Sequence, residues 1–219
     1  MKSFLLVVVF ALLSTLAHSQ KGLHLGAKGA IQNTWMFNAD DSDDPDWLYV
    51  PTFRSSFGAS FSYFLSDAVG VGVDVLYSMQ GQRYEINGQE LFTKTNYLKI
   101  PVLFHFHSNA ESAALFYLNA GPQFGILSRS SVEADLPFLG STELETTDEY
   151  AALNIGAVLG LGAGFNITDF LMLTTGLRFD IAFTDAEDKD SIAFASTRAP
   201  TNNATAGFEI GLRYVLRSN

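Results

Sequence analysis

The sequence has no cysteine, few basic residues and, after its N-terminal stretch, no long apolar run with a helical period. The lack of cysteine excludes a disulfide-stapled scaffold, a lipid-modified cysteine anchor and thiolate chemistry. The balance of 13 Lys and Arg against 23 Asp and Glu argues against nucleic acid as a partner. Any membrane span must therefore be built from β-strands closed into a barrel, because an open sheet leaves edge amides unsatisfied in lipid.

The first 19 residues have the pattern of a secretory signal peptide. Lys2 gives a positive start, Phe4 to Leu16 is apolar, and Ala17-His18-Ser19 is a small-x-small cleavage site. The alternative is a retained anchor, but the apolar stretch is short for crossing a bilayer. We predict a signal peptide at residues 1–19 and an outer-membrane β-barrel domain at residues 20–219.

The stretch from Tyr150 to Phe183 decides the fold class. Its first part is uncharged, and the GxxxG spacings of Gly156, Gly160 and Gly164 would suit the packing face of a transmembrane helix. The period contradicts a helix, because large apolar residues and small residues alternate at every second position. We therefore predict a long β-hairpin with its turn at residues 166–169.

The same alternation occurs in eight segments, and the connections between them alternate between long and short. In an up-and-down antiparallel sheet, alternate connections lie at the same end, so the long loops share one rim and the short turns the other. Pro101 removes a ladder donor from the fourth strand, where we expect a bulge or weakened pairing. The predicted strands lie near 23–35, 52–65, 69–80, 96–106, 114–126, 151–165, 171–183 and 204–216, with long loops at 36–51, 81–91, 128–149 and 184–202.

The two faces of these strands differ in size and polarity. One is bulky and apolar, whereas the other is rich in Gly, Ser, Thr and Asn. A soluble lipocalin-like barrel would turn the bulky face inward around a ligand. The small polar face suits a narrow interior better than a soluble surface, so we turn the bulky face to lipid. The prediction is an all-β fold, an eight-stranded antiparallel up-and-down transmembrane β-barrel with long extracellular loops, short periplasmic turns and periplasmic termini.

The charged residues on the small face are expected to lie in the lumen. Eight strands leave an interior just wide enough for side chains, so these charges must meet one another as a packed ionic plug. Such a plug needs no transport role. The predicted lumenal charge network consists of Arg54, Asp74, Lys99, Arg178, Asp180, Glu209 and Arg213.

Three stretches resemble a known family: LYSMQGQRY at 76–84, NYLKIPVLFHF at 96–106 and FYLNAGPQFGIL at 116–127. With the signal peptide and the Gly-rich hairpin, they are similar to the PorT-like, porin-family outer-membrane β-barrel domain common in Bacteroidetes-type, Gram-negative bacteria. The resemblance implies export to the cell outer membrane and a barrel architecture. Such barrels often finish on an aromatic residue, whereas this chain ends in Arg217-Ser218-Asn219.

The positions of the histidines argue against a catalytic site. Outer-membrane enzymes that act on acyl chains place His, Ser and an acid near the outer rim. Here His24, His105 and His107 are predicted at the short-turn end. We therefore expect no enzyme activity and no cofactor.

The first long loop is acidic enough to suggest a cation site. The spacing Asp40-x-Ser42-x-Asp44-x-Asp46 matches part of a calcium-binding loop. Such a loop has glycine at its sixth position and an acidic residue at its twelfth, but here Pro45 and Pro51 occupy those positions. A solvated, self-repelling loop is the better interpretation. The candidate metal ligands are Asp40, Asp41, Asp43, Asp44 and Asp46.

The expected function is that of a non-enzymatic outer-membrane β-barrel protein with a side-chain-filled lumen and a structural or surface-interaction role. The long loops at 36–51, 128–149 and 184–202 hold 15 of the 23 acidic residues. The alternatives are an accessory component of a protein export system, a narrow porin-like conduit and a soluble lipocalin-like ligand binder. The expected partners are outer-membrane lipid and lipopolysaccharide, the barrel-assembly machinery during biogenesis, and a protein partner at the extracellular loops.

Overall fold

The computed structural model describes residues 21–86, 88–108, 114–136, 140–194 and 197–217. The predicted signal peptide at residues 1–19 lies outside this range. None of the helices among the described residues is long and apolar enough to span a membrane. The elements are β1 (Gly22–Phe37), α2 (Ala39–Asp43), β2 (Trp47–Val50), β3 (Thr52–Phe64), β4 (Val69–Ile86), β5 (Gln89–His107), β6 (Ala114–Leu136), β7 (Gly140–Glu145), the 3-10 helix η1 (Thr147–Glu149), β8 (Leu153–Asn166), β9 (Leu171–Ala182) and β10 (Asn202–Arg217).

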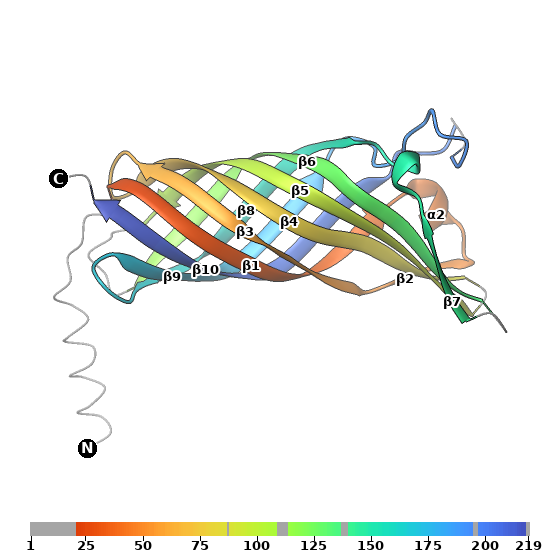
Figure 1. Cartoon of the computed structure of the whole chain (residues 1–219), viewed down its shortest axis with the longest axis horizontal. Coiled ribbons are helices and arrows are strands. Elements are labelled where there is room, and N and C mark those ends of the chain that lie inside the picture. Colours follow the sequence, from red (N-terminus) through yellow and green to blue (C-terminus); the bar gives the residue numbers. More distant parts are fainter. Residues whose placement is uncertain (1–20, 87, 109–113, 137–139, 195–196, 218–219) are drawn as a thin grey trace, which may run out of the picture.

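Eight of the strands form a closed antiparallel ring in the order β1-β3-β4-β5-β6-β8-β9-β10 (Figure 1). The ring closes because β1 pairs with β3 on one side and with β10 on the other, from Gly22 opposite Arg217 to Phe37 opposite Asn202. Each strand of the ring pairs with its sequence neighbour in the ring, as an up-and-down barrel requires. The predicted all-β, eight-stranded antiparallel up-and-down barrel is confirmed.

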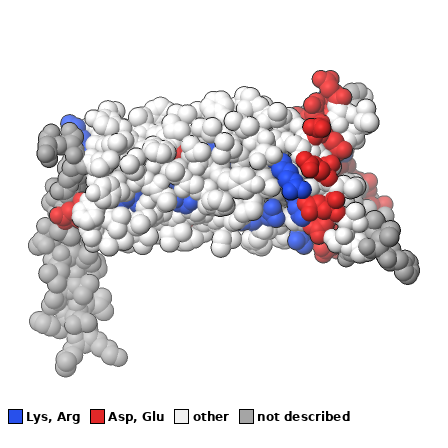
Figure 2. Space-filling view, in the orientation of Figure 1, with Lys and Arg blue, Asp and Glu red and all other residues white. Residues whose placement is uncertain are grey.

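The bulky face of the ring points outward. Ile31, Phe53 and Phe116 are each about 70% exposed, whereas their small or polar strand neighbours face the interior. Figure 2 shows a largely uncharged barrel wall with acidic side chains gathered at the loop end. An apolar exterior does not suit a soluble lipocalin-like barrel, which would need that face inside.

The glycine-rich stretch that could be mistaken for a membrane helix forms β8 and β9, as its period predicts. The hairpin turn falls after Asn166 and before Leu171, where residues 166–169 were predicted to turn. The two strands pair from Gly156 opposite Ala182 to Asn166 opposite Met172. The two-residue alternation therefore predicted the secondary structure correctly, whereas the GxxxG spacing would have suggested a helix.

Two predicted loops are largely strand. Residues 81–91 continue β4 to Ile86 and begin β5 at Gln89, and residues 128–149 extend β6 to Leu136 and contain β7 and η1. The first loop, 36–51, likewise contains α2 and β2, and β2 pairs with β4. These parts lie beyond the apolar band, where the outer face no longer needs apolar side chains. The alternation that reveals a strand in sequence is therefore lost there.

Pairing around Pro101 is weakened, as expected, but the bulge lies elsewhere. The β5–β6 ladder passes from Pro101 opposite Gln123 directly to Phe104 opposite Ala120, without pairs at the two residues between. The register shift falls between Asn96 and Tyr97, towards the loop end. A missing amide donor thus loosens the ladder at the proline without changing its register.

The narrow ring brings some strands so close that only glycine fits. A Cβ atom added at Gly58 on β3 would contact the Val75 carbonyl oxygen and lie 2.8 Å from the Leu76 Cα. At Gly160 on β8 the nearest atom would be the Asn119 Cβ, 3.7 Å away, which is ordinary contact.

We therefore expect Gly58→Ala to destabilise the barrel by about 1–3 kcal/mol, the usual cost of overpacking. The matched Gly160→Ala variant should change stability little. The temperature at which the folded form unfolds, followed as heat-modifiable migration on gels, measures both variants. Equal unfolding temperatures for the two would contradict the close approach of β3 and β4.

Candidate functional site

Three of the cations that enter the lumen each lie beside glycine on at least one neighbouring strand. Glycine has no side chain, so the space it leaves lets a long charged side chain extend across the barrel. The small face recognised in the sequence is therefore what accommodates the lumenal charges. The register partners are Gly58 and Gly211 for Lys28, Gly160 and Gly207 for Arg178, and Gly125 for Lys99.

Asp180 on β9 is one centre of the lumenal network. Its carboxylate accepts a hydrogen bond from Lys99 Nζ at 2.8 Å and lies 3.0 Å from Arg178 Nε. The Thr205 hydroxyl on β10 donates to the same carboxylate at 3.1 Å. Lys99 belongs to β5, so this contact crosses the lumen rather than joining strand neighbours. All three charged side chains are at most 7% exposed.

Lys28 on β1 forms the second centre. Its Nζ lies 2.9 Å from Asp74 on β4 and 3.2 Å from Glu209 on β10. Arg178 joins the two centres, because its Nη1 lies 3.5 Å from Glu209 while its Nη2 donates to Gln123 on β6 at 3.0 Å.

Three cations therefore meet three carboxylates in the lumen: Lys28, Lys99 and Arg178 against Asp74, Asp180 and Glu209. Removing ions from water costs several kcal/mol each, and a network that balances its charges offsets this cost. Its members come from five of the eight strands of the ring. The arrangement ties opposite walls of the barrel together.

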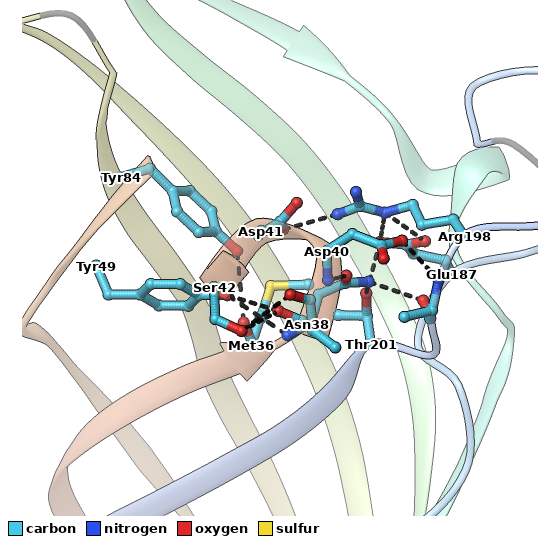
Figure 3. A network of polar contacts seen from close by, with 12 residues as sticks. Met36, Asn38, Asp40, Asp41, Ser42, Tyr49, Tyr84, Glu187, Arg198 and Thr201 are labelled. Carbon is cyan, nitrogen blue, oxygen red and sulfur yellow. Dashed lines mark hydrogen bonds and ion pairs between the residues drawn. The ribbon is translucent and has the colours of Figure 1, made fainter. Parts of the chain in front are cut away.

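A second polar cluster closes the loop end, and Arg198 is its centre (Figure 3). Arg198 Nη2 donates to Asp41 on α2 at 2.7 Å, and its Nε donates to both carboxylate oxygens of Glu187 at 3.0 and 3.1 Å. Asp41 and Glu187 are each 5% exposed. This residue therefore fastens the last long loop to the first.

Asn38 and Thr201 support the same cluster. The Asn38 side chain donates to the Thr201 hydroxyl at 2.7 Å, and that hydroxyl donates to Glu187 at 2.6 Å. Burial by itself would lower the pKa of Arg198, but the hydrogen bonds and charges of Asp41 and Glu187 raise this pKa overall. The guanidinium therefore stays charged throughout the physiological pH range.

A cavity of about 190 Å³ lies beside this cluster. Aromatic and charged side chains share its lining, among them Tyr84, Tyr150, Phe194 and Arg198. Tyr150 and Phe194 pack edge to face, with ring centroids 5.5 Å apart. The loop end is thus a folded surface with an aromatic and polar hollow.

Comparison with known proteins identifies the architecture. The family described as outer membrane protein beta-barrel domain matches residues 17–188 of this chain. The chain belongs to that family. Membership of this family implies that the chain is located in the outer membrane. No curated protein sequence matches the chain.

Solved structures of outer-membrane proteins are similar to this chain. Neisserial surface protein A is 14% identical, with a TM-score of 0.50 over 90% of this chain and 98% of that chain. OprG of Pseudomonas aeruginosa is 10% identical, with a TM-score of 0.49 over 93% of this chain and 99% of that chain. Ail of Yersinia pestis is 12% identical, with a TM-score of 0.45 over 88% and 99%. At these identities the likeness is one of fold.

Five of the seven residues predicted for the lumenal charge network lie together, and two do not. Arg213 pairs with neither Glu209 nor Asp180; its Nη1 lies 3.3 Å from His107 Nε2. Arg54 lies over the Phe92 ring, with its guanidinium carbon 5.3 Å from the ring centroid. The five that meet are Asp74, Lys99, Arg178, Asp180 and Glu209.

The three histidines gather around one phenylalanine at the short-turn end. The Phe64 ring lies 4.6 Å from His24, 5.6 Å from His105 and 4.4 Å from His107, measured between ring centroids. The Arg213 guanidinium lies 5.7 Å from the same ring. The arrangement is a buried aromatic layer that closes this end of the lumen.

The acidic residues of the first loop diverge instead of converging on one point. Asp41 is paired with Arg198, and Asp40 accepts a hydrogen bond from the Ala199 amide at 2.8 Å. Asp44 caps the amide of Asp46, and Asp43 is exposed. Within the part of the chain that the structure describes, no group of three His, Asp or Glu side chains is arranged to hold a metal ion.

Sequence reasoning missed Lys28, Arg198 and Glu187. Lys28 had a signal, because it alternates with outward Ala27 and Gly29 and so faces the lumen. Arg198 and Glu187 had none, since they lie in a loop without periodicity and meet only through the fold.

The lumenal network predicts a large effect for a small change at Asp180. Asp180→Asn keeps the shape but leaves Lys99 without its carboxylate, so we expect a loss of about 3–5 kcal/mol in stability. The exposed loop residue Asp190 provides the control, and Asp190→Asn should change stability little. Urea unfolding in detergent measures both. Adding Lys99→Met should recover part of the loss, because no buried charge is then left unpaired.

The outcome for Asp180→Asn distinguishes two kinds of lumen. A variant as stable as its parent would mean that Lys99 is hydrated, as in an open lumen. Equal stability of Asp180→Asn and the double variant would mean that the pair is not coupled.

The loop-end cluster offers a matched pair on one short helix. Asp41→Asn removes the charge that holds Arg198, so we expect a local loss of about 1–3 kcal/mol and faster proteolysis within 183–201. Asp43→Asn changes an exposed carboxylate of the same helix and should leave the cleavage rate unchanged. Limited proteolysis of the folded protein followed by mass spectrometry measures the rates. Similar rates for both variants would show that Arg198 does not fasten the loops.

Proposed function

We propose that this chain is a non-enzymatic outer-membrane barrel that does not conduct, with a structural or surface-interaction role at its acidic loop end. The observation that carries the proposal is the balanced network of three cations and three carboxylates across the lumen. An eight-stranded interior has little space beyond its own side chains. Tyr97, Leu103 and Met172, all at most 2% exposed, add bulk to it.

The loop end supports the surface role. Its loops are fastened to one another by Arg198, so it offers a defined surface rather than a set of loose segments. Ile192 is fully exposed there, and Leu144 is 64% exposed. In this proposal these two apolar side chains contact a partner at the loop end. In this proposal the signal peptide is cleaved, the termini are periplasmic, and the loop end faces the outside.

An accessory role in protein export is a second candidate. It is favoured by the resemblance of residues 96–106 and 116–127 to PorT-like proteins. The genes beside this one test it, because secretion genes in the same neighbourhood would favour export. A closed lumen is compatible with an accessory role but not with a narrow conduit.

The lack of native cysteine makes lumen closure directly measurable. We expect a membrane-impermeant maleimide added to intact cells to label Ile192→Cys and to spare Ser62→Cys, which lies beyond the charge network in a buried position. The purified native protein should show no stable single-channel steps in planar bilayers. Denatured protein provides the control that the second thiol is reactive. Labelling of Ser62→Cys from outside, together with stable currents, would establish a conduit instead.

A further inference from the structure

The cavity at the loop end combines aromatic and acidic side chains in one small space. Its volume is about 190 Å³, and its lining comes from the first loop, from the outer parts of β4, β5 and β6, and from the last long loop. Figure 3 shows part of this lining, with Tyr84, Asp41, Glu187 and Arg198 close together. Mouths of β-barrels are common places for small-molecule sites. The chemistry of the lining therefore decides what this cavity can bind.

Among the described residues, four aromatic side chains line the cavity, in two pairs. Trp47 on β2 and Tyr84 on β4 pack edge to face, with ring centroids 5.0 Å apart. Tyr150 and Phe194 form the second pair, in the same geometry at 5.5 Å. Tyr84 and Tyr150 are only 5% and 8% exposed, so packing holds both rings in place. A ligand can therefore contact these rings at little cost in ordering side chains.

The rest of the lining carries more negative than positive charge. Its carboxylates belong to Asp41, Glu149 and Glu187, and Arg198 is the one cation of the lining among the described residues. Arg198 is already held by Asp41 and Glu187. Lys189 adds a second ion pair to Glu187 at 3.0 Å. Even with Lys189 counted, one carboxylate remains in excess.

Glu149 is the carboxylate that these pairs leave over. Its side chain has no ion pair within the described part of the chain. Its backbone is fixed, because its amide donates to the Thr146 carbonyl at 3.0 Å and its carbonyl accepts from the Asp188 amide at 3.0 Å. Tyr150, the next residue, forms a β-bridge with Glu187. The excess carboxylate therefore extends from a rigid part of the wall, next to an aromatic residue.

We propose that this cavity binds a small organic cation, a substituted ammonium group whose charge meets Glu149 and whose alkyl groups contact Tyr150 and Phe194. Aromatic rings attract ammonium groups through their π-electrons, and the excess carboxylate adds Coulomb attraction. The same charge repels anions. The cavity is smaller than the usual site of a drug-sized ligand, so it suits a group of about the size of choline. The acidic loop end around it raises the local concentration of cations.

Such a site goes beyond the proposed surface role. It needs neither a closed lumen nor a protein partner at Ile192. Its absence would leave that role standing, and stable channel currents would leave the site standing.

The fluorescence of Trp47 can report directly on the cavity. The chain has two tryptophans, so Trp35→Phe leaves Trp47, which lines the cavity, as the only indole. The folded protein is titrated in a non-ionic maltoside detergent, because zwitterionic detergents carry cationic nitrogen groups themselves. The probes are choline and its uncharged isostere dimethylbutanol, in which carbon replaces the ammonium nitrogen. Calorimetry provides a second measurement of binding.

We expect choline to bind at least about tenfold more tightly than the neutral isostere. Glu149→Gln keeps the shape of the side chain and should remove most of this preference. The matched control is Asp148→Asn, because Asp148 lies on the same short helix without lining the cavity, and it should leave the preference unchanged. Phe194→Leu should weaken the binding of choline about threefold or more, through the loss of cation–π contact.

Heat-modifiable migration establishes that each variant is folded. Equal affinity for choline and its isostere would overturn the proposal, because the cavity would then be a neutral apolar hollow. Equal effects of Glu149→Gln and Asp148→Asn would also overturn it, since the general acidity of the loop end would then attract the cation. The same conclusion would follow if Phe194→Leu left binding unchanged, or if choline gave no response by either fluorescence or calorimetry.

Discussion

Closure of the sheet between β1 and β10 is the constraint on which the rest of the structure depends. In lipid, every backbone amide needs a partner within the protein. Every residue of β1 from Gly22 to Phe37 has a register partner on β10, and β3 pairs with the other side of β1. Closing a ring of eight strands fixes a narrow interior. In so narrow an interior, only small residues fit where strands approach closely, and a buried charge is stable only beside an opposite charge. The glycine pattern and the ionic network follow from these demands.

The sequence predicts the fold wherever lipid imposes a pattern. β8 and β9 were recognisable because one face must be apolar and the other small, so residues alternate every second position. Beyond the apolar band that demand ends. β4 continues through Gln82, Arg83 and Tyr84, which are polar or mixed on both faces, and nothing in this stretch distinguishes a strand from a loop. The strand extensions at the loop end were therefore missed for a physical reason.

Period also predicts which charges face the lumen, but it does not predict their partners. Lys99 meets Asp180 across the barrel, and this pairing depends on strand tilt and stagger rather than on closeness in sequence. Arg213 was predicted to belong to the lumenal charge network, yet it lies against His107 and Phe64 at the short-turn end. Arg54 lies outside the network because its guanidinium packs over the Phe92 ring of β5, a contact that its place in the alternation of β3 does not indicate. The contacts of Arg198 could not be predicted from the sequence, because they form only between folded loops.

The placement of charge indicates where this barrel can recognise other molecules. The lumenal network is balanced, so the net charge of −10 must lie outside it. An excess of one sign is tolerated only where water and salt screen it, and the acidic residues accordingly gather at the loop end (Figure 2). Buried Asp41 and Glu187 are the exceptions there, and each needs Arg198. Charges that are already paired hold the structure together. Under the proposed surface role, long-range attraction of a partner therefore comes from the acids of the rim.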